Sequence, residues 1–106
     1  MADAYKVLYQ GQLPNSATAI ATVGGGKSWI VKHISIVNTT AAAVTFSLYR
    51  NGLTDATRWL PEAVSVPAKG FAEWDGCECL AAGETIGAIA SAATSLTCTI
   101  SGDEVS

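Results

Sequence analysis

The sequence predicts an all-β fold, a single jelly-roll-like β-sandwich of about eight antiparallel strands. Turn-forming residues recur at short intervals along the 106 residues, which is typical of sandwiches and barrels. The segments between these turns alternate apolar and polar residues or are rich in β-branched ones, and both patterns favour strands. Such strands pair mostly with distant parts of the chain, so we expect two packed sheets.

Residues 27–38 are the longest stretch that fits only a strand, because it is rich in Ile and Val and lacks good helix formers. A regular strand would have two apolar faces here, with Ile30, Ile34 and Ile36 on one and Trp29, Val31 and Val37 on the other. We therefore expect this central strand to be covered twice, by the domain core on one side and by a second layer or another subunit on the other.

The remaining strands are expected on both sides of the central one, at residues 4–10, 18–23, 43–50, 57–66, 70–80, 85–92 and 95–101. Their alternation predicts a buried core of Ile34, Ile36, Phe46, Leu48, Leu96 and Ile100. The Asn51-Gly52 pair predicts a tight turn.

In four segments, prolines, glycines or helical spacing modify the simple strand prediction. Residues 57–66 should form an irregular edge segment because Pro61 lies inside them and Pro67 directly follows, with a short helical turn near residues 54–59. Residues 70–80 form one strand or two that break at Gly76. Residues 86–93 also fit helical spacing, although Gly87 favours a strand. Residues 102–106 are expected to fray.

Composition excludes several classes of function. Charged residues make up 14% of the chain, against about 25% in ordinary soluble domains, and weakly charged surfaces are common where proteins pack together. A net charge of −3 argues against nucleic acid as a partner. We expect one domain over residues 1–106, with no signal peptide and no membrane partner, because no basic start or apolar run of ~20 residues is present.

The residues that could support chemistry do not form a recognisable site. Residues 24–28, Gly-Gly-Gly-Lys-Ser, resemble part of a phosphate-binding loop, but Ala21 replaces a required Gly and a strand follows instead of a helix. His33 is the single histidine, and no nucleophile motif accompanies it. Glu73 and Asp75 share a strand face, and paired carboxylates can bind a cation or cleave glycosides. We read them instead as a solvated or interface-facing pair near Trp74. We expect no catalytic residue, cofactor or metal.

Three cysteines cannot form a closed set of intramolecular disulfides. Cys98 alternates with apolar residues and is expected in the core. Cys77 and Cys79 share one strand face, and zinc is not expected because a structural site needs more ligands at wider spacing. Whether these two thiols or Glu78 point outward is left open by the pattern. If the thiols point outward, they are candidates for an inter-subunit disulfide in an oxidising medium.

Several segments taken together resemble a known family, namely Lys6–Pro14 (KVLYQGQLP), Ile30–Ile34 (IVKHI), Val37-Asn38, Leu48–Gly52 (LYRNG) and Ala81–Ile86 (AAGETI). With them the chain resembles the small all-β virion proteins of tailed bacteriophages, which act as head decoration, head-fibre or tail-associated proteins. The resemblance implies a jelly-roll-like fold, frequent trimers and no catalysis. It does not imply a location within the particle, and Cys77 and Cys79 are not part of the shared pattern.

These observations predict a non-enzymatic structural protein of a phage virion, made in the host bacterial cytoplasm. It would bind the particle surface as an oligomer, a trimer by the resemblance, with the major capsid protein or other virion proteins as partners. The alternative is a carbohydrate-binding or host-attachment module of a phage tail, which would expose aromatic rings in a concave patch. For the structural role, the expected inter-subunit contacts are Trp29, Trp59, Leu60 and Trp74.

Overall fold

The computed structural model describes residues 3–60, 64–92 and 94–106. Its eight strands are β1 (Asp3–Gln12), β2 (Thr18–Thr22), β3 (Ser28–Asn38), β4 (Val44–Arg50), β5 (Val64–Val66), β6 (Phe71–Leu80), β7 (Thr85–Ala90) and β8 (Leu96–Val105). A short 3-10 turn, η1 (Asp55–Thr57), lies where a helical turn was predicted. In the described part of the chain, no helix has the length and apolarity to cross a bilayer.

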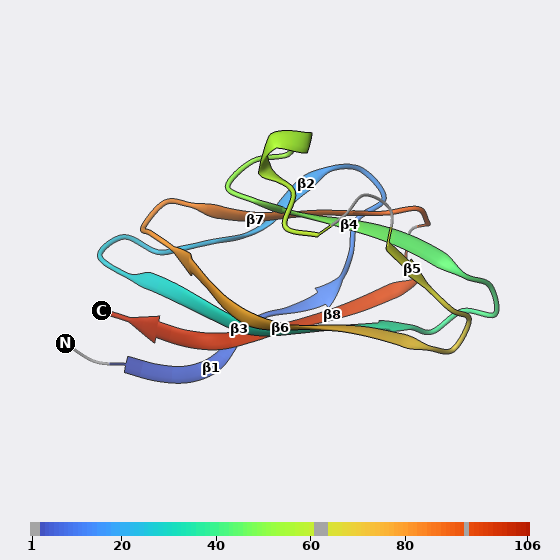
Figure 1. The fold of residues 1–106 in the computed structure, drawn as a ribbon, viewed down its shortest axis with the longest axis horizontal. Helices are drawn as coiled ribbons and strands as arrows, with labels where there is room; N and C mark the ends of the chain where they lie inside the picture. Colours follow the sequence, from blue (N-terminus) through green and yellow to red (C-terminus); the bar gives the residue numbers. More distant parts are fainter. Residues whose placement is uncertain (1–2, 61–63, 93) are drawn as a thin grey trace.

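The strands form two stacked antiparallel sheets (Figure 1). Sheet A has the order β1-β8-β3-β6, and sheet B has the order β2-β7-β4-β5. The all-β sandwich prediction is therefore confirmed. The pairing is nested, because β4 pairs with β5, β3 with β6, β2 with β7 and β1 with β8. Calling this strand order jelly-roll-like is our interpretation of the nesting.

A β-bulge in the central strand corrects the prediction that β3 has two apolar faces. Between Val31 and His33 the register shifts against both neighbouring strands: Lys32 is an extra residue against β8, whereas two residues of β6, Gly76 and Cys77, lie opposite it. An inserted residue reverses the side-chain phase beyond it. Trp29 and Val31 therefore face the core on one side of the bulge, and the next core positions are Ile34 and Ile36 on the other. One apolar face results, and the strand itself does not require cover on its second side.

The core lies between the sheets and matches the predicted set. All six predicted positions are buried: Ile34, Ile36, Phe46, Leu48, Leu96 and Ile100. The buried thiol of Cys98 lies in the same cluster, as expected for a small apolar residue. Side chains from both sheets interdigitate there, so the apolar surface of each sheet is removed from water by the other.

The prediction that residues 102–106 fray is wrong for most of the segment. Strand β8 continues to Val105, between β1 and β3, and it pairs with both. Gly102 makes this possible because a Cβ at that position would overlap the carbonyl oxygen of Ile30 and lie 2.9 Å from the Cα of Val31. The glycine thus lets β8 approach the β3 bulge closely.

The loop after β4 covers the side of sheet B that faces away from the core. Arg58 forms an isolated bridge with Tyr49, and the Trp59 N–H donates to the Leu48 carbonyl at 2.8 Å. Leu53 packs over Gly87, where a Cβ would lie 2.5 Å from its side chain. Figure 1 shows this segment, with η1, lying over β4 and β7. Tyr49 is buried as a result, although it points away from the core.

The predicted edge segment of residues 57–66 is only partly strand. Strand β5 is three residues long and forms the edge of sheet B, as expected for a Pro-containing segment. Of the two prolines on which the prediction rested, Pro67 directly follows β5, and Pro61 lies outside the described residues, as do residues 62 and 63. By contrast, β6 is a single long strand that Gly76 does not break, and β7 is a strand as the glycine in it suggested.

Candidate functional site

One side of sheet A faces away from the core and is called the outer face of sheet A below. It is the most accessible sheet surface in the described part of the protein. The strand registers align outward side chains in four rows across β1, β8, β3 and β6: Tyr5–Asp103–Ile30–Cys79, Val7–Ser101–His33–Asp75, Gln10–Thr99–Ser35–Glu73 and Gln12–Thr97–Val37–Phe71. No layer of the described chain lies over this face (Figure 1).

Exposed apolar side chains lie at two corners of the outer face of sheet A. Tyr5 and Phe71 are each 64% exposed, and they lie on the two edge strands at opposite ends of the face. Each has an exposed apolar neighbour, Val7 along β1 and Val37 directly across the β3–β6 ladder. Contiguous exposed apolar groups of this kind usually mark contacts with another molecule.

The polar centre of the outer face includes a tight ion pair. Lys32, projected by the β3 bulge, lies 2.9 Å from Asp103 on β8. The hydrogen bond to Asp103 is the main cause that raises the pKa of Lys32 above its ordinary value. This lysine is therefore committed to β8, and it holds the bulge against the neighbouring strand.

The orientation that the sequence left open near the thiols is settled by the register of β6. Glu78 lies opposite core-facing Val31, so it points inward, whereas Cys79 lies opposite Ile30 and points outward. Cys77 sits in the irregular segment of β6 facing Lys32, and both thiols are free and exposed. Cys98 differs, because burial raises the pKa of its thiol to about 12.

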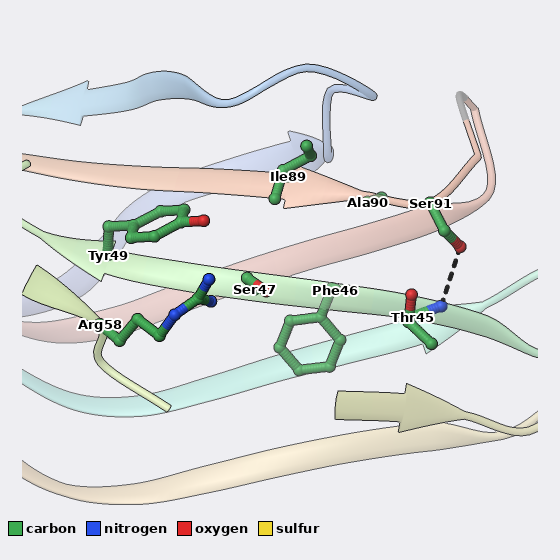
Figure 2. Close-up of a pocket in the computed structure, with 8 residues that line it drawn as sticks. All are labelled: Thr45, Phe46, Ser47, Tyr49, Arg58, Ile89, Ala90 and Ser91. Atoms are coloured by element: carbon green, nitrogen blue, oxygen red, sulfur yellow. Dashed lines mark hydrogen bonds between the residues drawn. The ribbon is translucent and has the colours of Figure 1, made fainter. Parts of the chain in front are cut away.

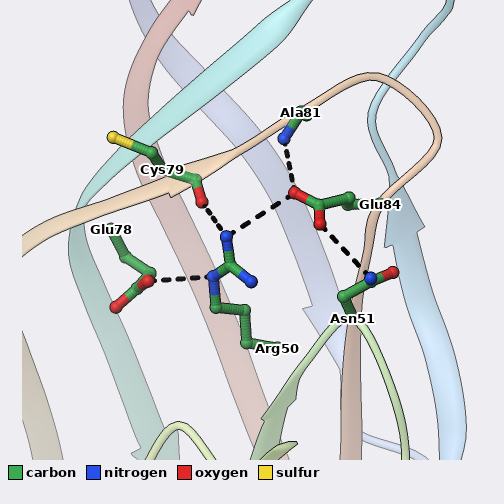
Figure 3. Close-up of polar contacts among 6 residues, drawn as sticks. All are labelled: Arg50, Asn51, Glu78, Cys79, Ala81 and Glu84. Atoms are coloured by element: carbon green, nitrogen blue, oxygen red, sulfur yellow. Dashed lines mark hydrogen bonds and ion pairs between the residues drawn. The ribbon is translucent and has the colours of Figure 1, made fainter.

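An arginine cluster fixes the end of β6 that carries Cys79 (Figure 3). Arg50, from β4 of the other sheet, donates to the Cys79 carbonyl at 2.5 Å and lies 2.9 Å from Glu78 Oε1. Glu84 lies 3.6 Å from the same guanidinium and accepts from the Ala81 N–H at 2.6 Å. The cluster ties the two sheets together and holds the backbone beneath the Cys79 thiol in one place.

The structure brings His33 together with Glu73 and Asp75, which are about forty residues away in sequence. His33 Nδ1 lies 2.5 Å from Asp75 Oδ1, and His33 Nε2 lies 4.0 Å from Glu73 Oε2. The histidine and the carboxylates lie on separate predicted strands, and their association in one group was not predicted. Antiparallel pairing of the two predicted strands was the available signal, but the register that joins them depends on the bulge.

The predicted inter-subunit tryptophans are mostly internal. Trp29 is 6% exposed and its indole N–H donates to Glu104 Oε2 at 3.0 Å, so its predicted contact role is corrected to core packing. The cause is again the bulge at Lys32, which turns Trp29 inward. Trp59 and Trp74 stack edge to face with ring centroids 5.4 Å apart. They and Leu60 are half-buried against the core.

A groove of about 290 Å³ lies on the far side of sheet B (Figure 2). Its most aromatic wall is Tyr49, whose ring is covered by the Arg58 guanidinium at 5.2 Å. Ser91 lies at the other end and accepts the Thr45 N–H at 3.0 Å. Because Tyr49 is buried and covered, it does not provide the open stacking platform expected of a carbohydrate-binding module.

The glycine-rich segment at residues 24–26 is a connection between two strands. Strand β3 begins at Ser28, directly after Lys27, so no helix N-terminus is available there to hold a phosphate. This agrees with the interpretation of the segment as a loop.

Comparison with known proteins finds similarity at the level of the fold. A solved structure from work on Bacillus endospore appendages, described as a novel family of disulfide-linked pili, is similar with a TM-score of 0.51. Sequence identity is 16%, and the match covers 99% of this chain and 87% of the other. No family model and no curated protein matches the sequence. At this identity the likeness shows a shared fold alone.

Proposed function

We propose that this chain is a non-enzymatic structural subunit that works in a homo-oligomeric assembly, with copies in contact through the outer face of sheet A. The observation that carries the proposal is the pair of exposed apolar corners on that face, at Tyr5 with Val7 and at Phe71 with Val37. Their burial between copies would remove apolar surface from water, which is the main driving force of association.

The assembly we propose is a bacteriophage virion, in which the protein is a decoration or fibre subunit. The resemblance of the sequence to small phage virion proteins supports this, and the low charge content suits a surface that packs against others. The partners would be further copies, as a trimer, and the major capsid protein or other virion proteins. Closed symmetry of this kind buries the apolar corners without forming filaments.

The structural neighbour supports a second candidate assembly, a surface appendage. That neighbour comes from disulfide-linked pili, and this chain also carries exposed thiols. In an appendage, the two apolar corners would belong to a heterologous interface, because they lie at opposite ends of one face and head-to-tail contact joins unlike patches. The oligomeric form, closed or open, therefore distinguishes the two candidates.

In either assembly we propose that Cys77 or Cys79 forms a disulfide between copies. Both thiols point outward from β6, and the Arg50 cluster holds the backbone at Cys79. Each S–S bond would form from two thiols while a small disulfide such as oxidised glutathione takes the two electrons and two protons and leaves as two thiols. Non-reducing electrophoresis of intact particles should show linked chains that a Cys77→Ser/Cys79→Ser variant lacks. Chains that remain monomeric under oxidising conditions would contradict the cross-link.

Sedimentation velocity of the purified chain at micromolar concentration, with reductant present, tests the proposed interface. The wild-type chain should sediment as an oligomer, and Tyr5→Ser/Phe71→Ser should shift it towards monomer. Leu53→Ser is the matched control, because Leu53 is 42% exposed but lies over sheet B, so its loss should leave the oligomer intact. A purely monomeric wild-type chain would contradict assembly in solution, and absence from purified phage particles would contradict the virion role.

A further inference from the structure

We propose that the outer face of sheet A binds a divalent transition metal ion of the Zn²⁺ class. Its ligands are His33 Nε2 and a carboxylate oxygen of Glu73, and Asp75 positions the imidazole. The inference does not depend on the proposed function, because it rests on three side chains of one chain. One potential ligand atom from each of the three lies within 4.8 Å of the other two, on the described part of the surface.

The ladder between β3 and β6 creates the group. Asp75 lies directly across from His33, and Glu73 lies one outward position further along β6, across from Ser35. All three side chains therefore leave the sheet on the same side. Since β6 is the edge strand of sheet A, no strand on its far side crowds the group.

Asp75 determines which nitrogen of His33 can bind a metal ion. An ionised carboxylate only accepts hydrogen bonds, so the 2.5 Å contact to Asp75 Oδ1 makes Nδ1 the donor. A neutral imidazole that donates through Nδ1 carries its lone pair on Nε2. Carboxylates that hold ligand histidines in this way are common behind metal sites, where they fix the tautomer and raise the basicity of the ring.

The free nitrogen faces Glu73 at a separation that suits one bound ion. His33 Nε2 and Glu73 Oε2 are 4.0 Å apart. Zinc lies about 2.0–2.1 Å from a nitrogen ligand and about 2.0–2.2 Å from a carboxylate oxygen, so both contacts can be made at once. Glu73 is 45% exposed on its side chain, which lets it rotate to improve the angle at the metal.

Charge also favours a cation at this position. In the described part of the chain, the closest side-chain partner of both Glu73 and Asp75 is His33, which in this tautomer is neutral and leaves both negative charges uncompensated. The nearest lysine along β3, Lys32, is committed to Asp103. Two carboxylates on neighbouring outward positions repel each other, and a divalent ion removes that repulsion. An imidazole ligand selects Zn²⁺, Ni²⁺ or Cu²⁺ over Mg²⁺, which prefers oxygen ligands alone.

Calorimetric titration tests the site, with Cys77→Ser/Cys79→Ser as the background so that the nearby thiols cannot bind the metal. One Zn²⁺ per chain should bind with micromolar affinity, because solvent fills the remaining coordination positions, and Mg²⁺ should not bind. His33→Gln and Glu73→Gln should each weaken binding at least tenfold. Gln12→Ala, on the same face but on the opposite edge strand β1, should leave it unchanged. No heat with Zn²⁺, or equal affinity in His33→Gln, would overturn the proposal.

Nitrogen-15 spectra of the imidazole give a second readout, which is unambiguous because His33 is the only histidine. Zn²⁺ should shift the Nε2 resonance and leave Nδ1 protonated. Asp75→Asn should shift the metal-free tautomer balance towards Nε2–H and weaken Zn²⁺ binding by about 10–100-fold, the usual cost of losing such a positioning partner. A metal shift at Nδ1, or an Asp75→Asn variant with unchanged tautomer and affinity, would contradict the assigned roles.

Discussion

Replacement of Gly102 by Ala should destabilise the fold severely, because β8 has no room for a side chain beside the β3 bulge. The added Cβ would overlap the carbonyl oxygen of Ile30 and lie 2.9 Å from the Cα of Val31, whereas ordinary contacts begin near 3.4 Å. Both obstructing atoms belong to backbone that is paired on both sides, so neither can swing aside as a side chain would. Overpacking of a well-packed core costs roughly 1–3 kcal/mol, and an immobile obstruction places this case at about 3 kcal/mol or more.

Urea unfolding followed by tryptophan fluorescence measures this cost. A loss of about 3 kcal/mol should lower the midpoint by roughly 1–3 M at the slopes usual for small domains. Gly25→Ala is the control, because no heavy atom lies within 4 Å of a Cβ built there, and its free energy of unfolding should be unchanged or slightly higher. A Gly102→Ala cost below 1 kcal/mol would show that β8 does not approach the β3 bulge as described.

The remaining predictions concern the core, the thiols and one carboxylate. Ile34→Ala should cost about 2–5 kcal/mol in urea unfolding, from lost burial and the cavity left behind, and a cost below 1 kcal/mol would contradict its core position. A thiol reagent should label Cys77 and Cys79 in the dilute folded chain but Cys98 only after denaturation. Burial shields the Cys98 thiol from the reagent and raises its pKa to about 12. Rapid labelling of all three cysteines in the folded chain would refute this prediction. Hydrogen bonds from the Trp29 indole and the Lys6 ammonium lower the pKa of Glu104. Wild type should therefore be more stable than Glu104→Gln at any pH above the ordinary glutamate pKa. This extra stability should disappear as the pH falls through the lowered pKa of Glu104 in the folded protein. If the stability difference between wild type and Glu104→Gln instead grew towards acid pH, the prediction would be wrong.

The strands could be predicted because alternation and turn residues are local signals. Phe46 and Leu48 alternate within β4 without interruption, and both are buried as expected. The faces of β3 could not be predicted in the same way, since Lys32 is inserted by a bulge that depends on the neighbouring strands. One inserted residue moved Trp29 from a predicted contact surface to the core.

The Arg50 cluster and the His33 group could not be predicted from the sequence either, because both depend on contacts between distant strands. Arg50 meets Glu78 across the gap between the sheets, and a partner in another layer leaves no trace in the local pattern. His33 meets Asp75 because their strands pair in one particular register. A shift of one residue would place the histidine opposite Trp74 instead, so the residue types alone could not establish the group.

The nested strand pairing separates folding from assembly in time. Strand β8 lies between β1 and β3, so sheet A cannot close until β8 has left the ribosome. Bringing β1 and β8 together joins residues 3–12 to residues 97–105, and such distant pairings slow folding. The four rows of the outer face each need a residue from β8, so this surface exists only after β8 has been made and paired. Partly synthesised neighbours on one messenger therefore cannot recognise each other through it, even though their unpaired strand edges make them prone to aggregate.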